Sequence, residues 1–216
     1  LNLWEEVLQT NPDFETIAVA NPPGVSPTGL RIAVNMLQGK ELNESKLGGV
    51  NGQSFVIDVP VIITPENLDE GLAICADKPD AYLLDGIMTD QEVLDAFFGE
   101  DMAMEMETFT IGISNPFISS EYRTQMIAEL IEINQEYMDE GYTTELVIES
   151  ADTDVAGQIQ QLQNLMAKDV DAILVNPGDV NGLNATLEEA VDKGIIVISV
   201  DQELDVPGVY NVGIDQ

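Results

Sequence analysis

The chain has 216 residues, of which 44% are hydrophobic and 6% aromatic, so it can bury a core and is not disordered throughout. Its 40 acidic residues against 7 basic ones give a net charge of −33, and such a surface repels nucleic acids and anionic lipid headgroups. With no histidine and one cysteine (Cys75), the sequence excludes an intramolecular disulfide, Ser-His-Asp and Cys-His catalysis and His-ligated zinc.

The first half of the chain is irregular, with two expected strands, one clear helix and long polar stretches. Strands are expected at 15–20 (ETIAVA) and 55–63 (FVIDVPVII). A helix is expected at 27–39, with Pro27 in its first turn and Gly39 at its end. The remaining expected features are a polar loop at 41–53, a short helix beginning at Thr64-Pro65-Glu66, a surface tail at 75–98 and a linker at 99–108.

The second half is regular. Short apolar runs, too short for helices, alternate with segments whose apolar residues recur every three or four positions. This alternation predicts βαβ units and a doubly wound, Rossmann-like parallel sheet of the α/β class. The expected strands are 109–113, 145–149, 172–176, 195–200 and 210–214. Three helices are expected. The helix at 120–139 is stopped by Gly141, and the helix at 181–193 is stopped by Gly194. The helix at 154–168 is capped by Asp152 or Thr153.

Polar residues follow these strands, at the edge where open α/β sheets bind ligands. Amides and carboxylates pair with ligand hydroxyls, and an aromatic face covers the C–H face of a sugar ring. The same residue types also suit turns and helix caps, and we expect that role for Asp152 and Asp179. Asp201 differs because no helix follows it, so capping and ligand binding stay open as alternatives there.

The even spread of charge, with 20 acidic residues in each of 1–107 and 108–216, favours an acidic surface adapted to high salt. A cation-binding role is the weaker alternative, because no D-x-D-x-D-G loop is present. The sequence also has no Walker-type loop and no G-x-G-x-x-G opening a helix. We therefore expect no metal site, no cofactor and no enzyme activity.

Residues 108–216 resemble the N-terminal lobe of type I periplasmic solute-binding proteins, the ribose, galactose and autoinducer-binding group. The resemblance lies in TIGISNPFISSEYR, ESADTDVAGQIQQLQNLMAKDVDAILVNPGD, LEEAVDKGIIVISVDQE and YNVGIDQ, in that order. Residues 1–74 resemble the C-terminal end of this family, and 75–107 its tail and a linker. The family's end thus precedes its beginning.

The chain of such a protein crosses between two lobes three times, and the helix matching 22–39 returns late to the N-terminal lobe. The resemblance therefore implies one nearly complete lobe here. It also implies that the strands at 15–20 and 55–63 belong to the missing lobe and lack partners. Ala20 and Asn21 fall where the hinge would be.

Three explanations of this order stay open. The chain could span the end of one binding module and the start of the next, be a circular permutant cut short, or be a unit whose missing lobe comes from a neighbouring chain. Leu1 and the stop at Gln216, directly after a strand, favour a fragment of something longer.

The resemblance implies ligand contacts at Asn115, Phe117 and Ile118 in the first loop. It also implies that the carboxylate of Asp201 binds sugar hydroxyls. Ribose-type members have an Arg at the position of Gln202, and many have a second aromatic at that of Ile118. These two departures argue against ribose-like specificity.

The function expected from the resemblance is extracytoplasmic capture of a sugar or similar small polar solute for the membrane permease of an ABC transporter, with no nucleic-acid partner. The alternative is a structural array or filament subunit, in which self-association supplies the missing lobe. An effector domain of a transcription regulator is disfavoured by the charge and by the absence of a basic helix-turn-helix. Fold analogy alone does not decide among these.

Overall fold

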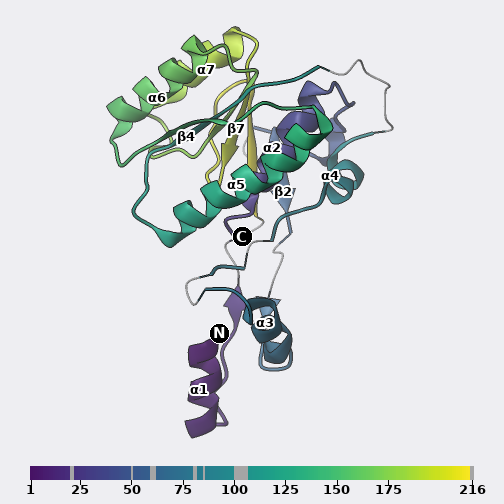
Figure 1. The fold of residues 1–216 in the computed structure, drawn as a ribbon, viewed down its shortest axis with the longest axis vertical. Coiled ribbons are helices and arrows are strands. Elements are labelled where there is room, and N and C mark those ends of the chain that lie inside the picture. Colours follow the sequence, from purple (N-terminus) through teal and green to yellow (C-terminus); the bar gives the residue numbers. More distant parts are fainter. Residues whose placement is uncertain are drawn as a thin grey trace.

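The computed structural model describes residues 1–19, 22–49, 51–58, 62–79, 82–84, 86–99 and 107–214. Figure 1 shows a larger α/β part and, below it, a smaller unit that contains the N-terminus. The expected hinge residues, Ala20 and Asn21, and most of the expected linker lie outside the described residues.

The larger part is built on a six-stranded parallel sheet, which confirms the expected doubly wound α/β fold. Helices cover both faces, so the strands are apolar on both sides rather than alternating. In order across the sheet, the strands are β2 (Ser54–Ile57), β8 (Val209–Ile214), β7 (Ile196–Val200), β6 (Ala172–Val175), β4 (Ile111–Asn115) and β5 (Val147–Ser150).

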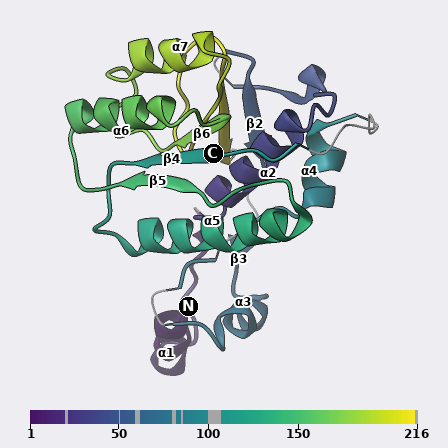
Figure 2. The same ribbon diagram turned by 45° about the horizontal axis from the view of Figure 1, so that its top comes forward.

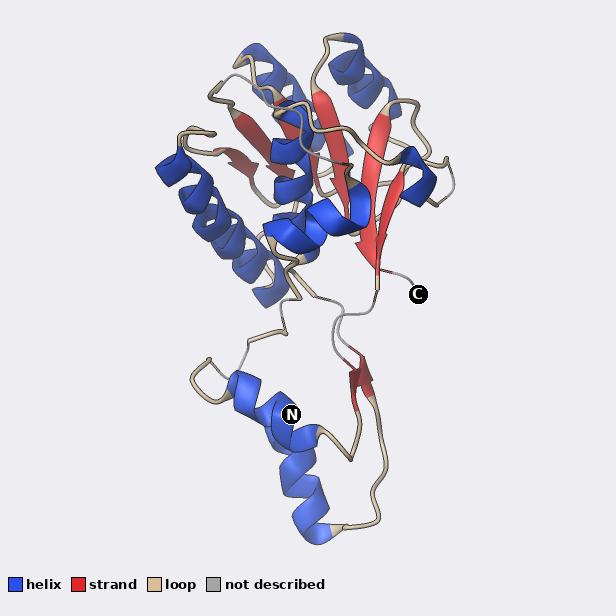
Figure 3. Ribbon diagram, turned by 90° about the vertical axis from the view of Figure 1, so that its right-hand side faces the viewer, coloured by secondary structure: helices blue, strands red, loops and turns tan. Residues whose placement is uncertain are grey.

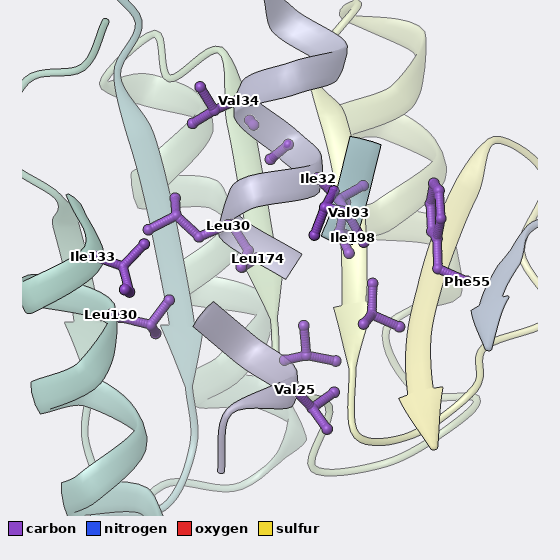
Figure 4. Close-up of a cluster of buried hydrophobic side chains, with 14 of the residues drawn as sticks. Val25, Leu30, Ile32, Val34, Phe55, Val93, Leu130, Ile133, Leu174 and Ile198 are labelled. Atoms are coloured by element: carbon purple, nitrogen blue, oxygen red, sulfur yellow. The ribbon is translucent and has the colours of Figure 1, made fainter. Parts of the chain in front are cut away.

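Two groups of helices sandwich this sheet (Figure 2). One face carries α2 (Val25–Leu37), α4 (Asp90–Phe97) and α5 (Glu121–Glu140), and the other carries α6 (Val155–Ala167) and α7 (Asn184–Asp192). A short 3-10 helix, η1, covers Glu44–Lys46. On the first face, Leu30 of α2 packs in one cluster with Leu130 of α5 and Leu174 of β6 (Figure 4).

The helix ends follow local chemistry. Gly141 ends α5 in the left-handed conformation, with a φ of 86°, as expected from its lack of a Cβ. The expected N-cap of α6, Asp152 or Thr153, was wrong. The N-cap is Asp154, whose carboxylate accepts a hydrogen bond from Gly157 N. Asp154 is the residue whose extended backbone places its carboxylate over the first turn.

The expected strand at 55–63 was wrong, because it is two strands in different sheets. Residues 54–57 form β2, parallel to β8, and Ile62–Ile63 form β3, antiparallel to β1 (Ala18–Val19). Phe55 is fully buried and its ring centre lies 5.1 Å from that of Phe97, which ties β2 to the core of the larger part. Pro60, between the two strands in sequence, has no N–H to extend a ladder. Residues 54–57 are therefore not left without a partner.

The smaller unit packs α1 (Asn2–Thr10) and α3 (Leu68–Cys75) against β1 and β3 (Figure 3). Trp4, Ile63 and Leu68 form its core. No element was expected at α1, although Leu1, Trp4 and Leu8 recur at helical spacing, and α3 begins at Leu68 rather than at Thr64. On the other face of this small sheet, the paired residues Val19 and Ile62 are 56% and 46% exposed.

The expected surface tail contains a helix that belongs to the core. Thr89 and Glu92 form a reciprocal capping box at the start of α4, and Val93 and Phe97 are buried from it against the larger part. Residues 90–97 of this stretch therefore pack in the core of the larger part. No described helix is long and apolar enough to cross a membrane.

A candidate ligand-binding rim at the carboxyl ends of the strands

Because the strands of the larger sheet are parallel, their carboxyl ends share one edge, called here the rim. Asn115 ends β4, Ser150 ends β5 and Asp201 directly follows β7. The structure thus brings the predicted site residues of the first loop and of the β7–β8 loop to the same edge. The contacts of each residue decide what it can do there.

Asn115 is fully buried and shapes the first loop from below. Its Nδ2 donates to the carbonyl oxygen of Phe117 at 2.6 Å and to Ser150 Oγ at 2.9 Å. Its Oδ1 is buried and accepts no hydrogen bond from the described residues. Asn115 therefore fixes the loop and leaves one buried acceptor beneath it.

Phe117 and Ile118 lie on top of that loop, 45% and 53% exposed. Asp152 holds the loop from the neighbouring strand, since its carboxylate accepts from Ile118 N at 2.8 Å and from Ser119 Oγ at 2.6 Å. These hydrogen bonds lower the pKa of Asp152 below its ordinary value, and the hydrogen bond from Ile118 N has the largest effect. The predicted capping role of Asp152 was therefore wrong, because its carboxylate bonds across to the first loop.

Asp179 has the turn-stabilising role expected of it. Its Oδ1 accepts from Asn181 N at 2.9 Å and from Gly182 N at 2.7 Å, just before α7. These two backbone hydrogen bonds lower its pKa. Asp179 thus belongs to the framework of the rim.

Asp201 has a φ of 75°, unusual for a residue other than glycine, and its N–H donates to the carbonyl oxygen of Val212. Its Oδ2 lies 3.5 Å from Arg123 Nη2, at the start of α5. Burial lowers the pKa of Arg123, and the charge of Asp201 opposes that effect. Burial and then the charge of Asp201 raise the pKa of the adjacent Tyr122, whose hydroxyl donates to the carbonyl oxygen of Pro22.

A hollow of about 430 Å³ opens next to Asp201. Glu203 lines it together with Ser54 of β2 and Gly213 of β8. Gln202 lies between the two carboxylates in sequence and is partly exposed, and its carbonyl oxygen accepts from Ser199 Oγ at 2.7 Å. This hollow could not be predicted from the sequence, because β2 joins the sheet by pairing with a strand far along the chain.

Arg123 and Tyr122 are the site residues that sequence reasoning missed. A usable signal was present, because Arg123 is one of only seven basic residues and lies in the first turn of the helix expected at 120–139, shortly after the first loop. Within the described ranges, no cluster of three or more Cys, Asp or Glu side chains is arranged to hold a metal ion.

The second half of the chain is similar to known proteins. Residues 111–216, just under half of the chain, match the model of the periplasmic binding protein domain family. A putative rhizopine-binding protein of Rhizobium meliloti is 42% identical over 59 residues, which are 27% of this chain and 19% of that protein. A D-ribose/D-allose-binding protein of Pseudomonas aeruginosa is 32% identical over 54 residues, 25% of this chain and 17% of that protein.

Among solved structures, an ABC transporter solute binding protein from Thermobispora bispora DSM 43833 aligns at 28% identity with a TM-score of 0.46, covering 48% of this chain and 33% of that one. The matched segments span less than a fifth of the two curated relatives and a third of the solved structure.

Proposed function

We propose that the chain supplies one lobe of an extracytoplasmic solute-binding protein, because residues 111–216 match the model of the periplasmic binding protein domain family. It captures a sugar-like solute and delivers it to the membrane permease of an ABC transporter, without catalysis. The family is one of binding proteins, which supports a location outside the cytoplasm. The ligand class takes support from the two curated relatives, which are named for rhizopine and for ribose or allose.

The observation that carries the proposal is that an exposed aromatic residue and a partly exposed carboxylate lie at the same edge of the sheet. Phe117 offers an apolar face, and Asp201 offers acceptors for paired hydroxyls. Ile118 extends the apolar face, Gln202 adds an amide, and Asn115 supports the loop from below. These residues have the complementary chemistry of a polyhydroxylated ring.

Capture by such a rim needs a second surface to enclose the solute. The small sheet exposes an apolar face at Val19 and Ile62, and a two-stranded sheet is marginally stable when such a face is left uncovered. This exposed face supports the presence of a covering surface. We place the rest of the second lobe there, with the hinge at Ala20 and Asn21. Closure of two lobes on the solute is the motion that this architecture permits.

A binding assay on two single variants tests the proposed site. A panel of neutral sugars is titrated, with both lobes present, into the protein and into Asp201→Ala and Asp192→Ala, which remove the same charge. Asp192 is exposed near the end of α7, at the opposite edge of the sheet, and serves as the matched control. We expect Asp201→Ala to weaken binding at least about tenfold and Asp192→Ala to leave it unchanged. Normal binding by Asp201→Ala would show that the site is elsewhere.

A second candidate function is a structural subunit whose lobes are shared between chains. The exposed Val19 and Ile62 pair favours it as well, because a neighbouring copy could cover the same face. Measuring the mass of the native and the denatured material, at low and high salt, separates the two. Large native assemblies of chains of 23.5 kDa, with no response to sugars, would favour the structural subunit. A monodisperse species that binds a sugar would exclude it.

A further inference from the structure

A nearly buried ion pair lies at the rim. Arg123 Nη2, in the first turn of α5, lies 3.5 Å from Asp201 Oδ2, although 78 positions separate the two residues. The two side chains are 10% and 19% exposed. The guanidinium carbon of Arg123 is also 5.2 Å from the ring centre of Tyr122, so an aromatic face holds the cation from a second direction.

Burial of this pair is weak evidence that it stabilises the fold. Moving two charges out of water costs free energy, and replacing such a pair by apolar side chains is often neutral or stabilising. The chain has seven basic residues in all, and one of them lies at the edge where open α/β sheets bind ligands. A charged pair in that position indicates a role in binding.

We propose that Arg123 is a positioning residue that holds the Asp201 carboxylate at the rim and balances its charge, so that the site takes neutral polyhydroxylated ligands in preference to amines or acids. The ligand class rests on the proposed function, whereas the positioning of Asp201 does not.

The preference follows from the charges that face the ligand. A carboxylate has about four acceptor positions, so one bonded to a guanidinium still accepts from ligand hydroxyls. An acidic ligand would meet Asp201 and the second carboxylate of the hollow, Glu203. Arg123 already compensates the charge of Asp201, so a ligand ammonium group is attracted only weakly there. That attraction does not offset the free-energy cost of removing the ammonium group from water.

The backbone of Asp201 supplies a shape-matched variant. Its φ of 75° is tolerated by Asn as well as by Asp, so Asp201→Asn removes the charge without straining the loop. Arg123→Met removes the guanidinium and keeps much of the packing, and Arg123→Lys keeps the charge. The double variant Arg123→Met/Asp201→Asn removes both charges and remains testable if Arg123→Met alone folds poorly.

In the ligand arm, D-ribose, D-allose, myo-inositol, D-glucosamine and D-glucuronate are titrated, with both lobes present, into the protein and each variant, and chemical shifts are followed by NMR. We expect the wild-type chain to prefer a neutral sugar. Arg123→Met should lower the affinity for that sugar about tenfold and shift the preference towards glucosamine. Arg123→Lys should keep most of the wild-type affinity. In the Asp201→Asn background, Arg123→Met should cause no further loss, because it acts through Asp201.

Three results would overturn the ligand class: a wild-type preference for glucosamine or glucuronate, unchanged binding by Arg123→Met, or losses that simply add in the double variant. If no probe binds the wild-type chain, the proposed function and the ligand class fall together.

The ligand-free arm then decides the positioning by itself. Hydrogen exchange is measured at the Asp201 amide, which donates to Val212, and at the amides of α6 as an internal reference. We expect Arg123→Met to speed exchange at Asp201 about tenfold, Arg123→Lys to have little effect, and the α6 amides to stay unchanged. No change at Asp201, or an equal rise throughout, would overturn the positioning role.

Discussion

Arg31 Nη1 lies 2.6 Å from Asp90 Oδ2, and this ion pair joins helix α2 to helix α4. Arg31 Nη2 lies 2.9 Å from Glu136 Oε2 on α5, and the hydroxyl of Tyr137 donates to Asp90. One buried guanidinium therefore links three helices on the same face of the sheet.

Arg31→Met is expected to lower the free energy of unfolding by roughly 2 kcal/mol, because it leaves two carboxylates without their partner. The figure is below that for fully buried pairs, since the side chains of Asp90 and Glu136 are 45% and 53% exposed. Urea unfolding at neutral pH measures the change. Lys193→Met, which breaks an exposed pair with Glu189, is the control and should cost less than about 0.5 kcal/mol. Equal losses in the two variants would contradict the prediction.

Phe55→Ala tests the placement of β2 in the larger sheet. Phe55 is fully buried against Phe97 and Tyr210, so its truncation should cost about 3–5 kcal/mol in urea unfolding. The adjacent Val56 is 40% exposed, and Val56→Ala should change stability by less than about 1 kcal/mol. If the two substitutions have the same effect, residues 54–57 are not held in this core.

The Glu149–Lys168 pair gives a stability difference that depends on pH. Lys168 Nζ lies 2.7 Å from Glu149 Oε1, and this hydrogen bond is the main cause that lowers the pKa of Glu149 from its ordinary 4.5. A carboxyl with a lowered pKa in the folded chain stabilises it above the unfolded pKa and loses that effect as the pH falls through the folded pKa.

Lys168→Met should therefore cost up to about 1 kcal/mol at pH 7, a small value because Lys168 is 50% exposed. The difference from wild type should shrink towards zero by roughly pH 3. Lys46→Met removes the same charge from an exposed position and serves as the control for net charge. A loss that is the same at both pH values would mean that Lys168 acts by packing alone.

The net charge of −33 predicts that salt stabilises the chain. Screening shortens the reach of repulsion from about 10 Å at 0.1 M to 3 Å at 1 M. Raising KCl over that range should raise the melting temperature by about 4 °C, equivalent to between 1 and 2 kcal/mol for a chain of this size. Sucrose serves as an uncharged control for cosolute effects. An unchanged melting temperature in KCl would argue against an adaptation of the surface to salt.

The sequence predicted the sheet of the larger part well because each of its strands in the second half is a short apolar run covered on both sides. β6 and β7, for example, lie within a residue of the expected 172–176 and 195–200. Pro60 indicated a break within 55–63, but the position of β2 could not be predicted, because β2 pairs with β8, at the other end of the chain. The helix α4 could have been found from Thr89 and Glu92, whose spacing is that of a capping box.

The candidate site was predictable only in part. The rim position of Asn115 and Asp201 follows from the strand pattern, and the exposure of Phe117 agrees with a surface loop. The scarcity of basic residues could have drawn attention to Arg123, but its pairing with Asp201 depends on how α5 crosses the sheet and has no local pattern. The binding roles of Asn115, Phe117, Ile118, Asp201 and Gln202 stay predictions until the titrations are done.

The position of α2 has a consequence for biosynthesis. A Cβ on Gly29 would meet Val200 Cγ1 at 3.0 Å, so a helix made early packs directly on strands made late. At 5–20 residues per second, roughly ten to thirty seconds separate the synthesis of α2 from that of its partners. The apolar face of α2 is therefore synthesised before the strands β6 and β7 that cover it, and a chaperone that binds nascent chains has a target there during that interval.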